Sequence, residues 1–273
     1  MCERQLDLFS ASGIPPQSHA EPRVRQPELV PADLDDAALV AAIPPAGIAD
    51  APDLAAEAGR RQLVAAIAAL EQLCLRFAGF GLERAVPEQV AALRALALIG
   101  GPESAQAVAR LIARSVVQGP TRKVALGIAA RLNSALPAAT VIALLQDADP
   151  DVRADACRCA GAWLAAIPVL LDLTDDADGS VRIAALCALG RLGSREARPG
   201  LARLLRDAPS VEIIDAVAGI ADEDCVIVLG RIVRTRPALA DAGRAALELI
   251  DHPRARQVVA ALAAERDQPD TGK

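Results

Sequence analysis

Residues that could carry out acid–base or nucleophilic chemistry are few in this chain of 273 residues. The only histidines are His19 and His252, and neither stands in a sequence context that suggests a nucleophile with a partner base. The glycines fall at the boundaries between predicted helices, so no glycine-rich phosphate loop is present. We therefore expect no catalytic residues, no cofactor and no enzymatic activity.

The six cysteines also lack the spacing of a metal site or a disulfide framework. No Cys-x-x-Cys pair occurs, and Cys157 and Cys159 are two positions apart, which points them to different faces of a helix. We expect no bound metal. Cys74, Cys157, Cys187 and Cys225 are instead expected to act as small buried hydrophobic residues.

The one segment with a strong binding signature is the apolar pentad Gln5-Leu6-Asp7-Leu8-Phe9. It precedes residues 10–33, where five prolines alternate with Ser, Gln, Glu and Arg and cannot bury enough apolar surface to fold. The sequence therefore predicts a flexible tail over residues 1–32 that exposes the pentad. Leucine and phenylalanine side chains of such a segment can fill an apolar pocket while a glutamine amide forms hydrogen bonds at its rim.

This pentad is similar to the bacterial sliding-clamp-binding motif, Gln-Leu-x-Leu-Phe, of DNA polymerases and of replication and repair proteins. Gln5, Leu6, Leu8 and Phe9 match its four defining positions, and Asp7 occupies the variable one. The resemblance implies that these five residues bind the clamp. A chance match, with the apolar side chains folded back onto the helices, is the alternative.

A repeat dominates the rest of the chain. Segments that begin near residues 91, 122, 152, 181, 211 and 241 resemble one another at a spacing of 29 to 31 residues, which is typical of a solenoid. Each has Val, Ala and Leu at helical spacing, and a second predicted helix precedes it, with a last helix over residues 254–265. Turns rich in Asp, Pro and Gly, such as 147–151 and 175–179, separate the two helices. Although residues 225–229 are apolar enough for a strand, their place in the repeat predicts a helix.

Two copies of the repeat carry its most specific residues. The pattern Asp-Pro-x-Val-Arg, with Ala and Gly at later positions, appears in residues 149–153 and, in part, in 179–182. It resembles the HEAT repeat family, in particular the short bacterial type seen in phycobilisome lyase-like proteins. The resemblance implies an all-α solenoid of about six helical hairpins over residues 87–267. We expect Arg153 and Arg182 to pair with Asp149 or Asp178 and so tie neighbouring units together.

The segment before the array is predicted to be an N-terminal helical cap over residues 33–86. A short helix is expected over 35–43, ended by two prolines, and a longer helix over 57–77. Phe77 and Phe80 are expected to fill this cap. Residues 268–273 are expected to be a disordered tail.

Composition limits the function further. The formal net charge is −6 and aromatic residues make up 1% of the chain, which argues against tight direct binding of nucleic acid. No stretch is predicted to span a membrane and no secretion signal is present, so a cytoplasmic protein is expected. These observations favour a protein–protein adaptor that docks on the clamp. A general scaffold without a replication role is the alternative, and lyase-like or DNA-repair HEAT proteins are weaker ones.

Overall fold

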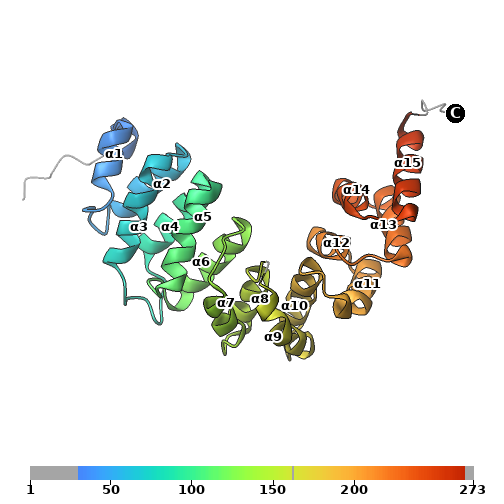
Figure 1. The fold of residues 1–273 in the computed structure, drawn as a ribbon. Helices are drawn as coiled ribbons and strands as arrows, with labels where there is room; N and C mark the ends of the chain where they lie inside the picture. Colours follow the sequence, from blue (N-terminus) through green and yellow to red (C-terminus); the bar gives the residue numbers. More distant parts are fainter. Residues whose placement is uncertain (1–29, 162, 268–273) are drawn as a thin grey trace, which may run out of the picture. The chain divides into compact units, whose positions relative to one another are not determined.

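The computed structural model describes residues 30–161 and 163–267, and this part of the chain is helical with no strand (Figure 1). Its fifteen α-helices are α1 (Asp36–Ala42), α2 (Ala51–Arg60), α3 (Ile67–Arg76), α4 (Pro87–Ile99), α5 (Gly101–Ala113), α6 (Gly119–Arg131), α7 (Ala138–Leu145), α8 (Pro150–Arg158), α9 (Ile167–Asp172), α10 (Gly179–Arg191), α11 (Arg198–Asp207), α12 (Val211–Ala218), α13 (Glu223–Thr235), α14 (Ala240–Leu249) and α15 (Pro253–Asp267). Six short 3-10 helices are η1 (Pro31–Asp33), η2 (Val64–Ala66), η3 (Leu164–Ala166), η4 (Leu173–Asp175), η5 (Arg195–Ala197) and η6 (Pro237–Leu239). The predicted all-α fold is confirmed.

The helices form two layers that alternate along the chain. The even-helix layer consists of α2, α4, α6, α8, α10, α12 and α14, each packed on the next. The odd-helix layer begins with α3, and within it α3 packs on α5, α7 on α9, α11 on α13 and α13 on α15. Each odd helix from α3 to α13 also packs on the even helix that follows it. Six helical hairpins, α3–α4 to α13–α14, therefore stack in chain order as the predicted solenoid.

Local sequence explains where several helices begin. Asp149 and Asp178 accept hydrogen bonds from the backbone amides of Asp151 and Ser180, which caps α8 and α10. Asp222 accepts a hydrogen bond from the amide of Cys225 at 3.0 Å and caps α13. The apolar residues of this segment, 225–229, are compatible with either a strand or a helix. The prediction from the repeat phase, a helix rather than a strand, is confirmed there.

The single helix predicted over residues 57–77 is wrong. The chain leaves α2 after Arg60, passes through Gln62 with φ +51°, and enters α3 at Ile67. The amide of Leu63 donates to the carbonyl of Ala58 at 3.0 Å, a bond that ends a helix with a left-handed residue. The apolar residues keep a helical spacing across this turn because both helices bury them in the same core. With glutamine in place of glycine at the left-handed position, the sequence gives little sign of the break.

The residues of the predicted cap extend the two layers, since α2 packs on α4 and α3 on α5. Phe77, which follows α3, is half-buried against the core. Phe80 is 63% exposed, so the expectation that it fills the cap is wrong. It lies in the α3–α4 loop between Gly79 and Gly81, which have left-handed φ of +84° and +88°.

Small residues let the even helices approach closely. A side chain at Gly190 would collide with the backbone of Ala216 on α12 and with Leu201 on α11. A side chain at Gly59 of α2 would lie 2.9 Å from the Cα of Ala95 on α4. The absence of a side chain at Gly190 therefore permits the close approach of α10 and α12. Gly161 follows α8 with φ +55°, a left-handed conformation that is common just after the end of a helix.

Arginines near the starts of even helices connect neighbouring units. Arg122 of α6 pairs with Asp147 at 2.7 Å, and Arg153 of α8 pairs with Asp176 through two hydrogen bonds of 2.9 Å each. Arg182 donates instead to backbone carbonyls at 2.7 and 3.0 Å, those of Asp176 and Ala177. The predicted tie between units is therefore present at Arg153. The predicted partners, Asp149 and Asp178, are wrong, because both residues cap helices. The carboxylates two positions earlier bind the arginines instead: Asp147 binds Arg122, and Asp176 binds Arg153.

Candidate partner-binding groove

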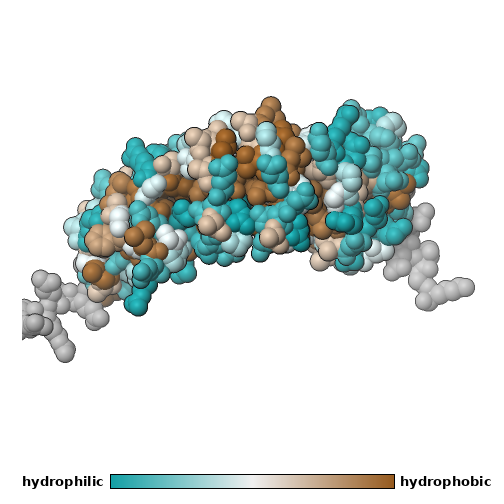
Figure 2. Space-filling model, turned by 90° about the horizontal axis from the view of Figure 1, so that it is seen from below, coloured by the Kyte–Doolittle hydropathy of each residue, from teal (hydrophilic) through white to brown (hydrophobic). Residues whose placement is uncertain are grey.

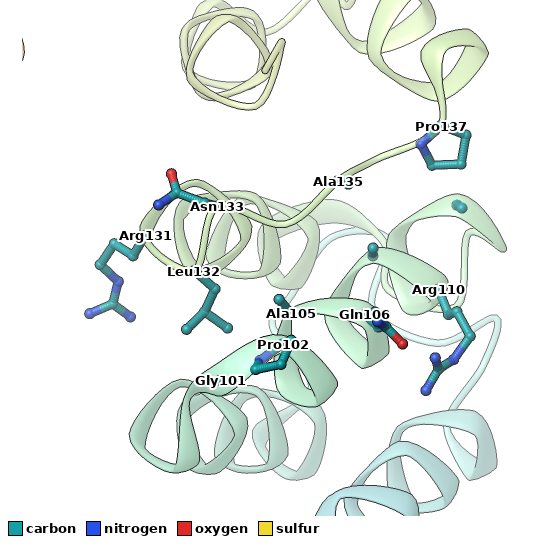
Figure 3. A pocket seen from close by; sticks show the side chains of 12 residues that line it. Gly101, Pro102, Ala105, Gln106, Arg110, Arg131, Leu132, Asn133, Ala135 and Pro137 are labelled. Carbon is teal, nitrogen blue, oxygen red and sulfur yellow. The ribbon is translucent and has the colours of Figure 1, made fainter. Parts of the chain in front are cut away.

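Three adjoining hollows meet at Asn133, in the turn between α6 and α7. The first, of about 780 Å³, lies between α5, the end of α6 and the start of α7. Figure 3 shows Gly101, Pro102 and Ala105 of α5 on one side of it, and Leu132 and Asn133 on the other. The second, of about 280 Å³, reaches Trp163, and the third, of about 750 Å³, extends over α8 to α12. Because they share Asn133, we treat them as one feature, the loop-edge groove.

The backbone at the centre of the groove is set by a helix-ending turn. Asn133 has φ +50°, and the amide of Ser134 donates to the carbonyl of Ala129 at 2.9 Å. The same geometry recurs two units later, where Gly193 has φ +77° and the amide of Ser194 donates to the carbonyl of Leu189 at 2.9 Å. In the first copy the left-handed position carries an asparagine, and Asn133 lines all three hollows.

One wall of the middle hollow is aromatic. Trp163, the only tryptophan of the chain, is 38% exposed there, and its indole N–H donates to the carbonyl of Leu136 at 2.8 Å. This bond connects the α8–α9 turn to the α6–α7 turn of the preceding unit. The indole is thus held in place with part of its surface open to a ligand.

Charged side chains of both signs line the third hollow. Its arginines are Arg131, Arg158 and Arg191, from the C-terminal turns of α6, α8 and α10, and its acids are Asp155, Glu212 and Asp215. Arg158 binds Asp155 at 2.7 Å. Burial nevertheless raises the pKa of Asp155 above its ordinary value, because desolvation of the carboxylate outweighs the effect of Arg158.

Glu212 interacts with two arginines of this cluster only at long distances. Its Oε1 lies 3.6 Å from Nε of Arg158 and 3.9 Å from Nη1 of Arg191, which is too far for hydrogen bonds. The oxygen is enclosed and has no hydrogen-bond partner among the described residues. Arg131 makes no ion pair within that part of the chain. The groove therefore offers the exposed side chains of Arg131 and Asp215, which make no ion pair among the described residues, to a ligand that carries both kinds of charge.

The described residues contain no cluster of three or more His, Cys, Asp or Glu that could hold a metal ion. The five cysteines of this part of the chain are free and buried, as predicted for Cys74, Cys157, Cys187 and Cys225. Burial raises the pKa of Cys74, Cys157 and Cys187 to about 12, so these thiols stay protonated and poorly nucleophilic. His252 accepts a hydrogen bond from the amide of Arg254 at 3.1 Å, within the turn that starts α15.

The site residues predicted from the sequence, Gln5, Leu6, Asp7, Leu8 and Phe9, lie outside the described residues. The groove itself was not predicted. A signal for it was present in the repeat: Arg131-Leu132-Asn133-Ser134 and Arg191-Leu192-Gly193-Ser194 are the same segment sixty residues, or two units, apart. Comparing units at this position would have shown the repeated arginine and the replacement of glycine by asparagine.

Comparison with known proteins agrees with this architecture. A family model described as HEAT repeats matches residues 137–221, which include α7 to α12. None of the curated proteins matches the chain significantly. The chain is similar in fold to a solved structure described as the complex of CpcE and CpcF of phycocyanin lyase from Nostoc sp. PCC7120, with 17% identity and a TM-score of 0.52. That match covers 86% of this chain and 99% of the other.

Within residues 30–161 and 163–267, no helix is both long and apolar enough to cross a membrane.

Proposed function

We propose that this chain is a non-enzymatic adaptor, which binds a protein partner in the loop-edge groove and docks on the DNA sliding clamp through Gln5–Phe9. The observation that carries the proposal is the groove: adjoining hollows over several helical units, with one aromatic wall and the exposed, unpaired side chains of Arg131 and Asp215. Such a surface offers many moderate contacts along an extended ligand. This is how stacked repeats bind other proteins.

The charge pattern of the groove favours a peptide ligand over nucleic acid. Three arginines and three carboxylates line one hollow, so a polyanion would bring phosphates against Asp155, Glu212 and Asp215. A peptide with both acidic and basic side chains can pair with both sets. The net charge of −6 also disfavours binding of a polyanion such as nucleic acid.

The structural neighbour supports binding of a protein chain as well. Its description is of a complex between two proteins, CpcE and CpcF, and the present chain is similar in fold to it. From this likeness we infer for the present chain only that its helical array binds a protein.

The clamp-docking part of the proposal rests on the sequence of the pentad. Four positions match the motif, and residues 10–30 separate the pentad from Pro31, where the described array begins. Leu8 and Phe9 would each contribute about 1.5 to 3 kcal/mol by burial, and Gln5 about 1 kcal/mol by hydrogen bonding. After the cost of ordering the tail, we expect a dissociation constant of roughly micromolar size.

The clamp part is tested by titrating the full chain against the sliding clamp of the same organism. Leu8→Ala with Phe9→Ala should abolish binding, whereas Asp7→Ala, at the variable position, is the matched control and should bind like the native chain. Absence of binding at hundreds of micromolar, or binding that survives the double substitution, would falsify the clamp assignment. The array part of the proposal would be unaffected.

The groove is tested separately with a photo-crosslinking residue at position 133 in living cells. The same residue at position 68, exposed on α3, is the control. We expect a discrete protein adduct at 133 that is absent at 68 and is lost when Arg131 and Arg158 are both changed to Glu. Identical adducts from the two positions, or an adduct that is insensitive to the charge reversals, would contradict the groove as the binding surface.

A further inference from the structure

A separate cavity lies where the C-terminal ends of α11 and α13 meet in the odd-helix layer. Its volume is about 230 Å³. Its walls are formed by Leu205, Arg206, Pro209, Val228, Arg231, Ile232, Thr235 and Arg236. Three of these eight residues are arginines and none is acidic. We call this feature the α11–α13 cavity. On the face drawn in Figure 2, hydrophilic side chains cover much of the surface toward the C-terminal end of the array.

The three arginines are not neutralised within the described part of the chain. Arg206, Arg231 and Arg236 are exposed, and none makes an ion pair or a side-chain hydrogen bond to another described residue. Their neighbour Arg234 shows the contrast, since it binds Glu265 on α15 through contacts as short as 2.7 Å. Arg198 of α11 lies 4.0 Å from Asp222 and donates to the carbonyl of Ile220 at 2.8 Å. The same two helices thus satisfy other arginines and leave these three with unused donors.

Helix dipoles do not account for the arrangement. A cation in the last turn of a helix is stabilised by the partial negative charge there, and Arg206 is placed for this in α11. That effect is local to each helix end and is screened by water. It gives no reason for three arginines, Arg206 on α11, Arg231 on α13 and Arg236 just after α13, to line one cavity.

We propose that Arg206, Arg231 and Arg236 bind an oxyanion of the phosphate-monoester class in the α11–α13 cavity. The planar guanidinium group presents paired N–H donors that match two oxygens of a phosphate, and three such groups offset the charge of a dianion. The apolar walls formed by Leu205 and Val228 exclude water from one side and strengthen the attraction. The volume equals several water molecules at about 30 Å³ each, so a phosphate group fits and a larger ligand would extend outward.

This site goes beyond the adaptor function and depends on neither the groove nor the clamp motif. The monoester can come from a small phosphorylated metabolite, as a free anion, or from a phosphorylated side chain of a protein, and the chemistry at the arginines is the same. An extended nucleic-acid backbone fits less well. Carboxylates stand next to the arginines in the chain at Asp207 and across the Arg234 ion pair at Glu265.

The test is calorimetric titration of the full chain with inorganic phosphate, and then with a phosphoserine peptide and its unphosphorylated form. The triple variant Arg206→Gln, Arg231→Gln, Arg236→Gln should weaken phosphate binding by at least about tenfold. The matched control changes three exposed arginines outside the cavity, Arg84→Gln, Arg94→Gln and Arg114→Gln. It alters the net charge equally and should change the affinity by less than about twofold.

Tighter binding of the phosphopeptide than of inorganic phosphate would support the site with a partner protein as the source. Equal binding would support it with a free anion as the source. If the triple variant is unfolded by circular dichroism, the single change Arg231→Gln decides, with an expected weakening of about threefold or more. Lack of saturable phosphate binding, equal losses in the cavity and control variants, or peptide binding that ignores phosphorylation would each overturn the proposal.

Discussion

Replacing Arg153 with methionine should destabilise the array by removing the tie between the α7–α8 and α9–α10 hairpins. The guanidinium donates twice to Asp176, at 2.9 Å each, and once each to the carbonyls of Asp147 and Ala148, at 2.9 and 3.0 Å. Asp176 is only 8% exposed at its side chain, so its charge would be left largely out of water with the amide of Asp178, at 2.8 Å, as its remaining hydrogen-bond partner. Hydrogen bonds to charged groups contribute about 1.5 to 3 kcal/mol, and we expect the free energy of unfolding to fall by about 3 kcal/mol.

Arg182→Met is the matched control. Arg182 makes the corresponding two bonds to backbone carbonyls, those of Asp176 and Ala177, but reaches no carboxylate in the next unit. The loss at Arg153 should exceed the loss at Arg182 by about 2 kcal/mol, which is the contribution of the link to Asp176. Urea unfolding followed by circular dichroism measures both, and a double-mutant cycle with Asp176→Asn isolates the pair.

The pair should also depend on pH. The hydrogen bonds from Arg153 hold the pKa of Asp176 below its ordinary value of 3.8. A carboxyl whose folded pKa is lowered stabilises the fold above its ordinary pKa, and that stability is lost as pH falls through the lower, folded value. The difference between the two variants should therefore be constant near neutral pH and shrink below about pH 4. Equal losses for Arg153→Met and Arg182→Met, or a difference that persists in acid, would refute the reasoning.

Three further outcomes follow from the same structure. Gly190→Val should lower the free energy of unfolding by roughly 1 to 3 kcal/mol, because the side chain would collide with Ala216. The control is Gly127→Ala on α6, which has no neighbour within 4 Å and should be neutral or stabilising in the same urea titration. Equal effects of the two substitutions would contradict the contact between Gly190 and Ala216. Thiol labelling of the native chain at pH 8, with Cys2 changed to Ser, should be slow at the five described cysteines and become complete in denaturant, since they are buried; rapid labelling of Cys157 under native conditions would count against the packing. The purified protein should bind duplex DNA weakly, and sub-micromolar, salt-sensitive binding in a fluorescence anisotropy titration would show that the acidic balance had been misjudged.

Several features of the fold follow from local sequence alone. Asp149, Asp178 and Asp222 cap helices through their own side chains, and the apolar period within each unit selects one face for burial. These signals recur at 29 to 31 residues, so the number of hairpins and the helical identity of residues 225–229 could be predicted. The prediction failed at Gln62, because glutamine is common inside helices and here adopts the left-handed conformation that ends one. The turn at Gln62 divides a segment whose apolar residues have helical spacing throughout.

The pairing of charges and the shape of the groove depend on how far one unit is rotated and shifted on the next. Arg153 meets Asp176, 23 residues away, and Asn133, Trp163 and Glu212 approach one groove from different units. Short-range patterns carry no information on that offset, because it is set by the contact of small residues such as Gly190 and Ala216 between helices. The repeat and its caps were thus determined by the sequence within each unit, whereas the inter-unit ties, the loop-edge groove and the arginine-lined cavity arose only when stacking brought distant side chains together.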